Sequence, residues 1–358
     1  MRPRIGILTS GGDCPGLNAV LRGVVLAADK LGWEVIGFRD GFEGLLPPGD
    51  HLILDHRNTN GIMPLGGTII GTTNRGHFAA KVGAGDRTIV SKNVIAGAKK
   101  ILDELNVGAL IIVGGDGSMI TAQQLQEAGI NCIGVPKTID NDLEATAMTF
   151  GFDSAVDVVV DALDRLHTTA TSHKRVIVVE VMGRHTGWIA LHGGLAGGAD
   201  VILIPEIPFD YDKIADVIKA RDGAGHLGTM VVVAEGAKAR HGQQVKRDVE
   251  GGEFRLGGIG DVVAREIAGR TGKETRCCVL GHLQRGGAPT VLDRILATRF
   301  GVKAVQLANE GHFGTMVSYQ NYQMRRVSIA DAVNRLKLVP PNGELVQTAR
   351  DVDISFGD

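Results

Sequence analysis

Two stretches decide the fold: ALIIVGGDGS at 109–118 and NCIGVPKTIDND at 131–142. Each begins with an apolar run of strand length and ends in glycines or acidic side chains. Asp116, Asp140 and Asp142 therefore follow the ends of two consecutive predicted strands, which is where parallel sheets bind ligands. Carboxylates hold Mg²⁺ or take up a proton, and glycines let the backbone come close to phosphate. The combination points to phosphoryl transfer.

Both motifs also have purely structural interpretations. Asp116 or Ser118 can simply cap the next helix, and 138–142 can be a turn, because Asn and Asp favour turns. We favour a ligand site, because Asp140 and Asp142 at positions i and i+2 of an extended segment project to one side. Like charges held together need a metal, a basic residue or a shared proton.

The chain alternates short apolar runs with helical patterns. Most runs are apolar throughout, which is typical of strands covered on both faces. The predicted strands are 4–9, 34–39, 109–115, 131–136, 175–181, 200–205, 229–236 and 275–281. Amphipathic helices are predicted near 93–106, with Ser91 as N-cap, and over 153–169 and 260–270. This order predicts an α/β fold: two Rossmann-like domains built on parallel sheets, with a cleft between them.

We expect one domain to comprise 1–142 plus 257–308, and a smaller one 143–256 plus 309–340. The polar, proline-containing segment 341–358 reads as a loosely packed tail.

Composition excludes several functions. The 358 residues carry 38 basic and 40 acidic side chains, a net charge of -2, so nucleic acid and anionic membranes are not expected as partners. The four cysteines have no metal-ligand spacing and suit a reducing compartment. No apolar window reaches membrane-spanning length and the N-terminus lacks the pattern of a signal peptide. We expect a soluble cytoplasmic protein.

Further polar groups follow other predicted strands. GILTSGGDCPGLN at 6–18 can present the N–H groups of Gly11 and Gly12 to an anion, although a plain tight turn explains it equally well. It is neither a Walker P-loop nor a GxGxxG motif. VMGRHTGW at 181–188 offers Arg184 to a phosphate, and GHLQRGG at 281–287 offers a histidine and an arginine. Taken singly, each of these residues is as well explained by solvation or capping.

Taken in order, GILTSGGDCPGLN, LGGTIIGT, GGDGS, PKTIDND, VEVMGRHTGW and VLGHLQRGG resemble the 6-phosphofructokinase family over most of the chain to about Arg299. The resemblance implies phosphoryl transfer from ATP, with Mg²⁺, to the 1-hydroxyl of fructose 6-phosphate. It implies that the larger domain binds the donor and the smaller one the sugar phosphate. The family is mostly tetrameric, which implies a homotetramer.

The resemblance also implies roles for individual residues. Asp140 would be the base, Asp142 its assistant and Asp116 the Mg²⁺ ligand. Thr138 would contact the transferring phosphoryl group, and Gly12 and Arg184 would stabilise it. The donor site would comprise Gly11, Gly12, Gly115, Asp116, Gly117, Ser118 and Lys137. The sugar-phosphate site would comprise Thr138, Met182, Gly183, Arg184, Glu235, His282 and Arg285, with Arg175 and Arg276 from a neighbouring subunit.

The donor signature is mixed. Gly117 is typical of ATP-dependent members, since an Asp there would crowd and repel the α-phosphate of a nucleotide, whereas Lys137 is typical of pyrophosphate-dependent members. We favour ATP, with pyrophosphate as the alternative. Either Asn74 or Arg75 can match the arginine expected after the GGT segment. A non-catalytic sugar-phosphate sensor is disfavoured by the presence of both Asp140 and Asp142. A lipid or dinucleotide kinase would share GGDGS but leaves 136–142 and 281–287 unexplained.

Overall fold

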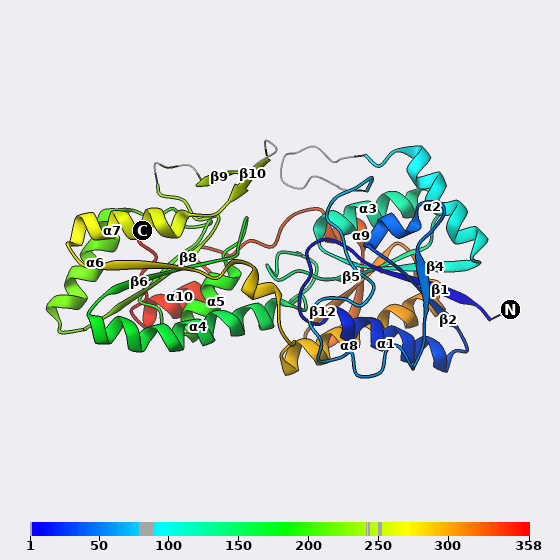
Figure 1. Ribbon diagram of the computed structural model, residues 1–358, viewed down its shortest axis with the longest axis horizontal. Coiled ribbons are helices and arrows are strands. Elements are labelled where there is room, and N and C mark those ends of the chain that lie inside the picture. Colours follow the sequence, from blue (N-terminus) through cyan, green and yellow to red (C-terminus); the bar gives the residue numbers. More distant parts are fainter. Residues whose placement is uncertain (1, 79–88, 241, 243, 250–252) are drawn as a thin grey trace. The chain divides into compact units, whose positions relative to one another are not determined.

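The computed structural model describes residues 2–78, 89–240, 242, 244–249 and 253–358. The chain divides into two compact units (Figure 1). Unit 1 consists of Met1–Ser154 and Arg285–Leu336, and unit 2 of Ala155–Gln284 and Lys337–Asp358. Residues 2–142, 155–240, 285–308 and 337–340 lie in the expected units. Four segments do not: 143–154, which belongs to unit 1, and 257–284, 309–336 and 341–358.

The reassigned segments follow their strand pairings. Residues 257–284 belong to unit 2, because β11 (Thr275–Val279) pairs with β6 (Val176–Val181). Residues 309–336 belong to unit 1, because β12 (Thr315–Gln320) pairs with β5 (Cys132–Pro136). The segment expected to be a loose tail is part of unit 2.

Two features tie that last segment down. It forms α10 (Glu344–Asp351), and its Phe356 is fully buried. Arg350 lies 4.9 Å from the centre of the Phe356 ring and pairs with Asp358. The polar composition of 341–358 gave no indication that Phe356 would be buried.

Unit 1 is built on a sheet of seven described strands in the order β13-β12-β5-β4-β1-β2-β3. The five inner strands are parallel, and β3 and β13 pair antiparallel at the edges. The strands not yet bounded are β1 (Arg4–Thr9), β2 (Glu34–Phe38), β3 (His51–Leu54), β4 (Val107–Gly114) and β13 (Gln323–Ser328).

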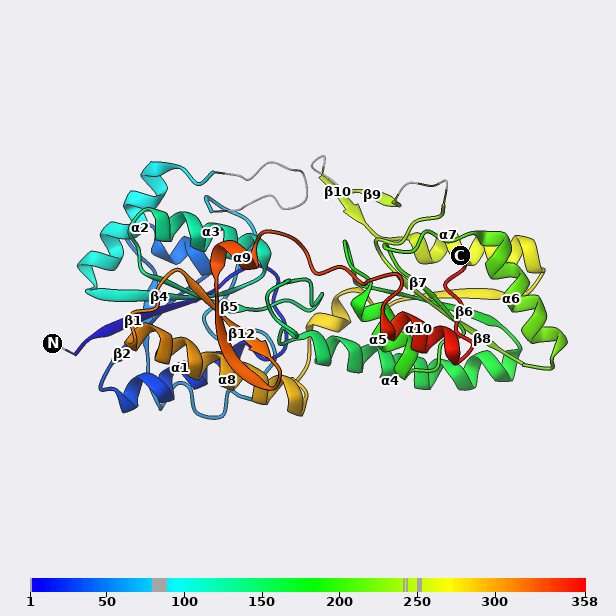
Figure 2. The same ribbon diagram turned by 180° about the vertical axis from the view of Figure 1, so that it is seen from behind.

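Helices cover both faces of this sheet. Helices α1 and α8 pack together on one face, and α2, α3 and α9 lie on the other (Figure 2). Close packing of α1 against α8 depends on Gly23 and Gly301, where a Cβ would meet backbone atoms of the opposite helix at 2.8 and 2.5 Å. Unit 1 contains α1 (Leu17–Lys30), η1 (Gly41–Leu45), α2 (Lys92–Glu104), α3 (Asp116–Glu127), α8 (Val291–Asn309) and α9 (Ile329–Ala332).

Unit 2 is built on a parallel sheet of four described strands in the order β11-β6-β8-β7. Every residue of β6 and β8 is buried, as their apolar sequences predict. A separate hairpin joins β9 (Lys246–Val249) and β10 (Glu253–Leu256). The remaining elements are α4 (Phe152–His173), α5 (Trp188–Ala196), β7 (Val201–Leu203), α6 (Tyr211–Gly223), β8 (Thr229–Ala234), α7 (Ile259–Thr271) and η2 (Gly281–Arg285). Helix α4 and η2 each contain residues of both units, because the boundaries fall after Ser154 and before Arg285.

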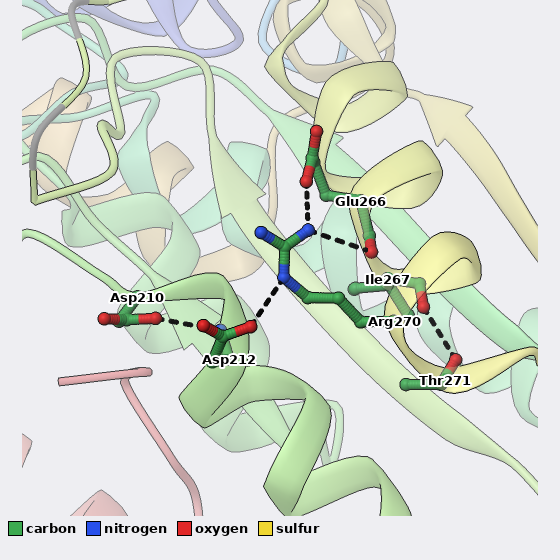
Figure 3. Close-up of polar contacts among 6 residues, drawn as sticks. All are labelled: Asp210, Asp212, Glu266, Ile267, Arg270 and Thr271. Carbon is green, nitrogen blue, oxygen red and sulfur yellow. Dashed lines mark hydrogen bonds and ion pairs between the residues drawn. The ribbon is translucent and has the colours of Figure 1, made fainter.

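Polar contacts join α6 and α7 at the surface of unit 2 (Figure 3). Arg270 donates from Nε to Asp212 at 2.8 Å, pairs with Glu266 one turn earlier, and lies over the ring of Tyr211. Asp210 caps α6 by accepting the backbone N–H of Asp212. Exposed ion pairs contribute only about 0–1 kcal/mol. The apolar core beneath them, which includes Ile214 and Ile267, therefore dominates the packing of these helices.

All eight strands predicted from apolar runs are confirmed, and so are the three helices, as α2, α4 and α7. Ser91 occupies the N-cap of α2, although its side chain makes no capping bond. The sequence did not reveal β3, β9, β10, β12 or β13, which are short or alternate polar and apolar residues. No helix in the described ranges is long and apolar enough to span a bilayer.

Candidate active site

A cavity of about 230 Å³ opens in unit 1 at the carboxyl ends of its parallel strands. Strand β1 has β2 on one side and β4 on the other, so the connections diverge at this point and leave room for a ligand. The loops that follow β1, β4 and β5 all reach the cavity. Its lining includes Gly11, Gly12, Gly115, Asp116, Gly117, Ser118, Lys137, Thr138, Asp140, Asp142 and Arg285.

The loop after β1 forms one wall. The N–H of Gly11 donates to the carbonyl of Thr73 at 3.1 Å, and Thr72 donates its hydroxyl to the carbonyl of Gly11 at 2.8 Å. The expectation that the Gly11 N–H faces an anion is therefore wrong. The backbone of Gly12 lies against the side chain of Arg285, because a Cβ at Gly12 would lie 2.7 Å from Nη1 of Arg285. Arg285 is fixed by donating from that nitrogen to the carbonyl of Asp13 at 3.0 Å.

The loop after β4 leads directly into α3, whose first residues line the cavity. Contrary to the structural interpretation, Asp116 does not cap α3: the N-cap position is Gly115, without a side-chain capping bond, and Asp116 only accepts the N–H of the next residue, Gly117, at 2.7 Å. Asp116 lines the cavity beside Gly115 and Gly117. Ser118 donates to the hydroxyl of Ser10 at 3.0 Å, which ties this loop to the one after β1. A helix N-terminus flanked by glycines is suited to phosphate.

The loop after β5 brings Asp140 and Asp142 to the same cavity. It is a turn and not the extended segment we expected, because Asn141 has a φ of 52°. Thr138 organises the turn by accepting the N–H of Asp140 at 3.1 Å. The alternative of a turn is therefore confirmed, and both acids still line the cavity.

Asp142 has a strongly perturbed acidity. Its pKa is raised from 3.8 to about 7, first by burial and then by the charges of Asp140 and Asp116, while a hydrogen bond with Thr138 opposes the rise. Three carboxylates around one small cavity thus disfavour full ionisation. The charges of Asp140 and Asp116 therefore favour the protonated form of Asp142.

Lys137 is buried at the floor of the cavity with 4% of its surface exposed. Its Nζ donates to the carbonyl of Gly12 at 2.5 Å and lies 3.4 Å from where a Cβ at Gly11 would be. Burial lowers the pKa of this lysine. The ammonium group therefore connects the loops after β1 and β5 beneath the space that a phosphate would occupy.

The donor atoms fit Mg²⁺. This hard cation prefers oxygen ligands, and it commonly takes one or two carboxylates plus waters and substrate phosphates. Among the described residues, no group of three or more His, Cys, Asp or Glu side chains is arranged to hold an ion unaided. A site with Asp116 as the protein ligand, completed by a polyphosphate, is compatible with this arrangement.

The predicted sugar-phosphate residues, apart from Thr138 and Arg285, lie in unit 2, most of them at the carboxyl ends of its strands. The N–H of Gly236 donates to the carbonyl of Gly183 at 3.0 Å, so the loops after β6 and β8 lie together, with Glu235 between them. The N–H of Met182 donates to the side chain of Gln284 at 3.3 Å, which adds the 281–285 turn that carries exposed His282. Arg184 is also exposed. The structure thus gathers Met182, Gly183, Arg184, Glu235 and His282 around one strand edge.

Arg175 and Arg276 lie apart from that group, near the amino ends of β6 and β11. Both pair with Glu274, at 2.7 Å for Arg175, and the hydrogen bond from Arg175 lowers the pKa of Glu274. The unit that contains them therefore does not bring them to its own sugar-phosphate residues.

Sequence reasoning missed part of the cavity lining. Ser10, Phe42, Glu43, Thr73 and Phe78 line it, and so do both Asn74 and Arg75, between which the sequence left the choice open. Glu43 accepts the N–H of His77 at 2.7 Å and the ring Nδ1 of that residue at 2.8 Å. The polar stretch GTTNRGH at 71–77 was the available signal.

Comparison with known proteins identifies the family. The family model described as phosphofructokinase matches residues 4–308. This chain belongs to the phosphofructokinase family. An ATP-dependent 6-phosphofructokinase of Chloroflexus aggregans is 51% identical over 357 residues, which cover 100% of this chain and 98% of that protein. A pyrophosphate–fructose 6-phosphate 1-phosphotransferase of Streptomyces coelicolor is 49% identical over 343 residues, covering 94% of this chain and 96% of that protein.

Solved phosphofructokinases share the fold. The chain matches phosphofructokinase from Saccharomyces cerevisiae with a TM-score of 0.81 and 30% identity, covering 93% of this chain but only 45% of the longer yeast chain. A pyrophosphate-dependent phosphofructokinase from Nitrosospira multiformis matches with a TM-score of 0.81 and 26% identity, covering 96% of this chain and 87% of that one. The α/β fold predicted from the sequence is confirmed.

Proposed function

We propose that this protein transfers the terminal phosphoryl group of ATP to the 1-hydroxyl of fructose 6-phosphate, with Mg²⁺. The observation that carries this is the convergence of three strand-end loops on one cavity, which brings Asp116, Asp140 and Asp142 together with Lys137 and Arg285. Family membership and full-length relatives named ATP-dependent 6-phosphofructokinase support it.

Asp140 is the proposed base. It takes the proton of the sugar hydroxyl as the oxygen bonds to phosphorus, which suits a carboxylate because a weak base removes a proton late in the reaction. Asp142, with its pKa raised to about 7 by burial, holds a proton more readily than an ordinary aspartate. A proton on Asp142 removes one negative charge beside Asp140, and the hydroxyl of Thr138 keeps the turn in place.

The rest of unit 1 positions and neutralises the donor. Asp116 would hold Mg²⁺, which when bound supplies charge neutralisation on the phosphates. Lys137 and Arg285 add positive charge on either side of the Gly11–Gly12 backbone. Gly12 leaves room for the transferring group, and Gly115, Gly117 and Ser118 present the N-terminus of α3 to the donor.

The sugar phosphate binds, in this proposal, to the strand-end residues of unit 2, with Arg184 also stabilising the transferred group. Arg175 and Arg276 serve the site of a neighbouring subunit in a homotetramer. Their separation from Met182, Glu235 and His282 within one chain supports that assignment, because they then need a second copy in order to act.

ATP is the proposed donor because Gly117 adds no carboxylate at the start of α3. Pyrophosphate is the alternative, favoured by Lys137 and by the relatives named for that donor, at 46–49% identity. Lys137 does not block a nucleotide, because its ammonium group is held down against the carbonyl of Gly12.

A coupled assay of fructose 1,6-bisphosphate formation tests the proposal. Fructose 6-phosphate is supplied with ATP or with pyrophosphate, each with and without Mg²⁺. We expect Mg²⁺-dependent product with ATP and a kcat/KM that exceeds the value with pyrophosphate. A strong preference for pyrophosphate would overturn the choice of donor, and no product with either would overturn the function.

A further inference from the structure

Helix α4 begins directly after a glycine. The residue before it is Gly151, which has no side chain with which to accept the first free N–H groups of the helix. The glycine is required, because its φ is 93° and a Cβ there would lie 2.6 Å from Sγ of Cys14. A side chain at this position therefore cannot cap the helix.

Asp293, in the first turn of α8, supplies a cap for α4. Its Oδ2 accepts the N–H of Ser154 at 2.8 Å and the hydroxyl of the same residue at 2.6 Å, and the N–H of Gly151 also interacts with the carboxylate. The side chain has no exposed surface, and burial raises its pKa to about 6. Complete burial of a carboxylate costs free energy unless hydrogen bonds compensate for the lost water.

The capping is reciprocal. Thr290 is the N-cap of α8 and accepts the N–H of Asp293 at 3.3 Å. Its hydroxyl donates to Asp153 in the first turn of α4 at 2.5 Å, and its N–H donates to the hydroxyl of Ser154 at 3.0 Å. The starts of α4 and α8 are thus locked to each other by four side chains within unit 1.

The segment fixed in this way pairs with the catalytic turn. Phe150 forms a parallel β-bridge with Lys137, and Thr149 donates its hydroxyl to the carbonyl of Thr138 at 2.7 Å. The N–H of Thr149 also donates to the side chain of Asn141, the left-handed residue between the two acids, at 3.2 Å. Movement at 149–151 would therefore move Asp140 and Asp142.

We propose that Asp293 is a positioning residue for phosphoryl transfer: by capping α4 from α8 it fixes residues 149–154 and, through them, the orientation of Asp140. The kinetic part of this inference rests on the proposed function. Asp293 is not among the described residues that line the cavity, so its removal acts on the geometry of the reaction and leaves ground-state binding intact.

The test compares Asp293→Asn with Asp331→Asn. Asp331 is a matched control, because its backbone N–H also bonds to the hydroxyl of a helix N-cap, Ser328 of α9, but its side chain is exposed. We expect Asp293→Asn to lower kcat about tenfold with both KM values within about twofold, and Asp331→Asn to match the wild type. A purely structural role would lower the melting temperature and leave kcat at 25 °C unchanged.

Hydrogen exchange followed by mass spectrometry supplies a second readout that does not depend on the reaction. We expect exchange of peptides covering 137–142 and 149–154 to accelerate about tenfold in Asp293→Asn and not in Asp331→Asn. If the wild type made no fructose 1,6-bisphosphate, the proposed function would fail and exchange alone would decide the positioning role.

Ser154→Ala guards against a variant that does not fold. It removes the hydroxyl contacts but keeps the backbone N–H on Asp293, so we expect about a threefold loss of kcat and a smaller change in exchange. Unchanged exchange at 137–142 in folded Asp293→Asn, or a kcat of Asp293→Asn within twofold of the wild type in an active enzyme, would overturn the inference.

Discussion

Replacing Asp142 with asparagine should stabilise the metal-free protein relative to the wild type at pH 8, but not at pH 4. Burial and the charges of Asp140 and Asp116 raise the pKa of Asp142 from 3.8 to about 7 in the folded state. The folded wild type therefore binds a proton that the unfolded chain has released. The contribution of the Asp142 carboxyl to the stability of the wild type is fully present below pH 3.8 and is lost as the pH rises through about 7.

The size follows from the two pKa values. A difference of about 3 units at about 1.36 kcal/mol each gives about 4 kcal/mol. Asp142 retains some contact with solvent in the cavity, which screens the charge, so we expect about 2 kcal/mol. Between pH 4 and pH 8, the unfolding free energy of Asp142→Asn should gain about that much relative to the wild type.

The two tryptophans allow the measurement to be confined to unit 1. Trp33 lies in unit 1 and Trp188 in unit 2, so a Trp188→Phe background leaves fluorescence from unit 1 alone. Urea unfolding in that background, with a chelator present, gives the free energy at each pH.

Asp55→Asn is the matched control, for which we expect the opposite change in stability with pH. The backbone N–H groups of Asn58 and Arg57 lower the pKa of Asp55, so removing this carboxylate should reduce stability near neutral pH and not at acid pH. If the wild-type and Asp142→Asn curves ran parallel from pH 4 to pH 8, the assignment of a proton-holding carboxyl to position 142 would be wrong.

Two further substitutions test the donor pocket. Gly117→Asp should reduce kcat/KM with ATP about a hundredfold and with pyrophosphate much less, because a carboxylate at the start of α3 would face a nucleotide α-phosphate; equal losses in a two-donor assay would refute this. Gly12→Ala should lower kcat/KM at least tenfold, because its Cβ would lie 2.7 Å from Nη1 of Arg285 and push that side chain off the carbonyl of Asp13. Wild-type kinetics in this variant would show that the Arg285 side chain can move away from Gly12 without affecting catalysis.

The sequence predicted most of the fold because the apolar runs of β1, β4, β5, β6 and β8 admit little besides buried parallel strands. It failed where pairing is decided by distant partners. Neither β12 nor β11 reveals its sheet locally, so residues 257–284 and 309–336 were placed in the wrong unit. The single buried ring of Phe356 is likewise invisible in a polar segment.

For the site, residue types were predictable but their connections were not. Glycines and acids after strands 109–114 and 132–136 indicated the cavity directly. The hydrogen bond that occupies the N–H of Gly11 comes from Thr73, more than sixty residues away, and the cap of α4 comes from Asp293 on another helix. No local pattern encodes such long-range contacts, and the cap from Asp293 also depends on how α8 packs in unit 1.

The central claim is that Asp140 removes the proton from the sugar hydroxyl. The most direct measurement is steady-state kinetics of Asp140→Ser with saturating ATP, Mg²⁺ and fructose 6-phosphate. The account predicts a fall in kcat of about 10²–10⁴-fold with affinity for fructose 6-phosphate retained. A kcat near that of the wild type would contradict it.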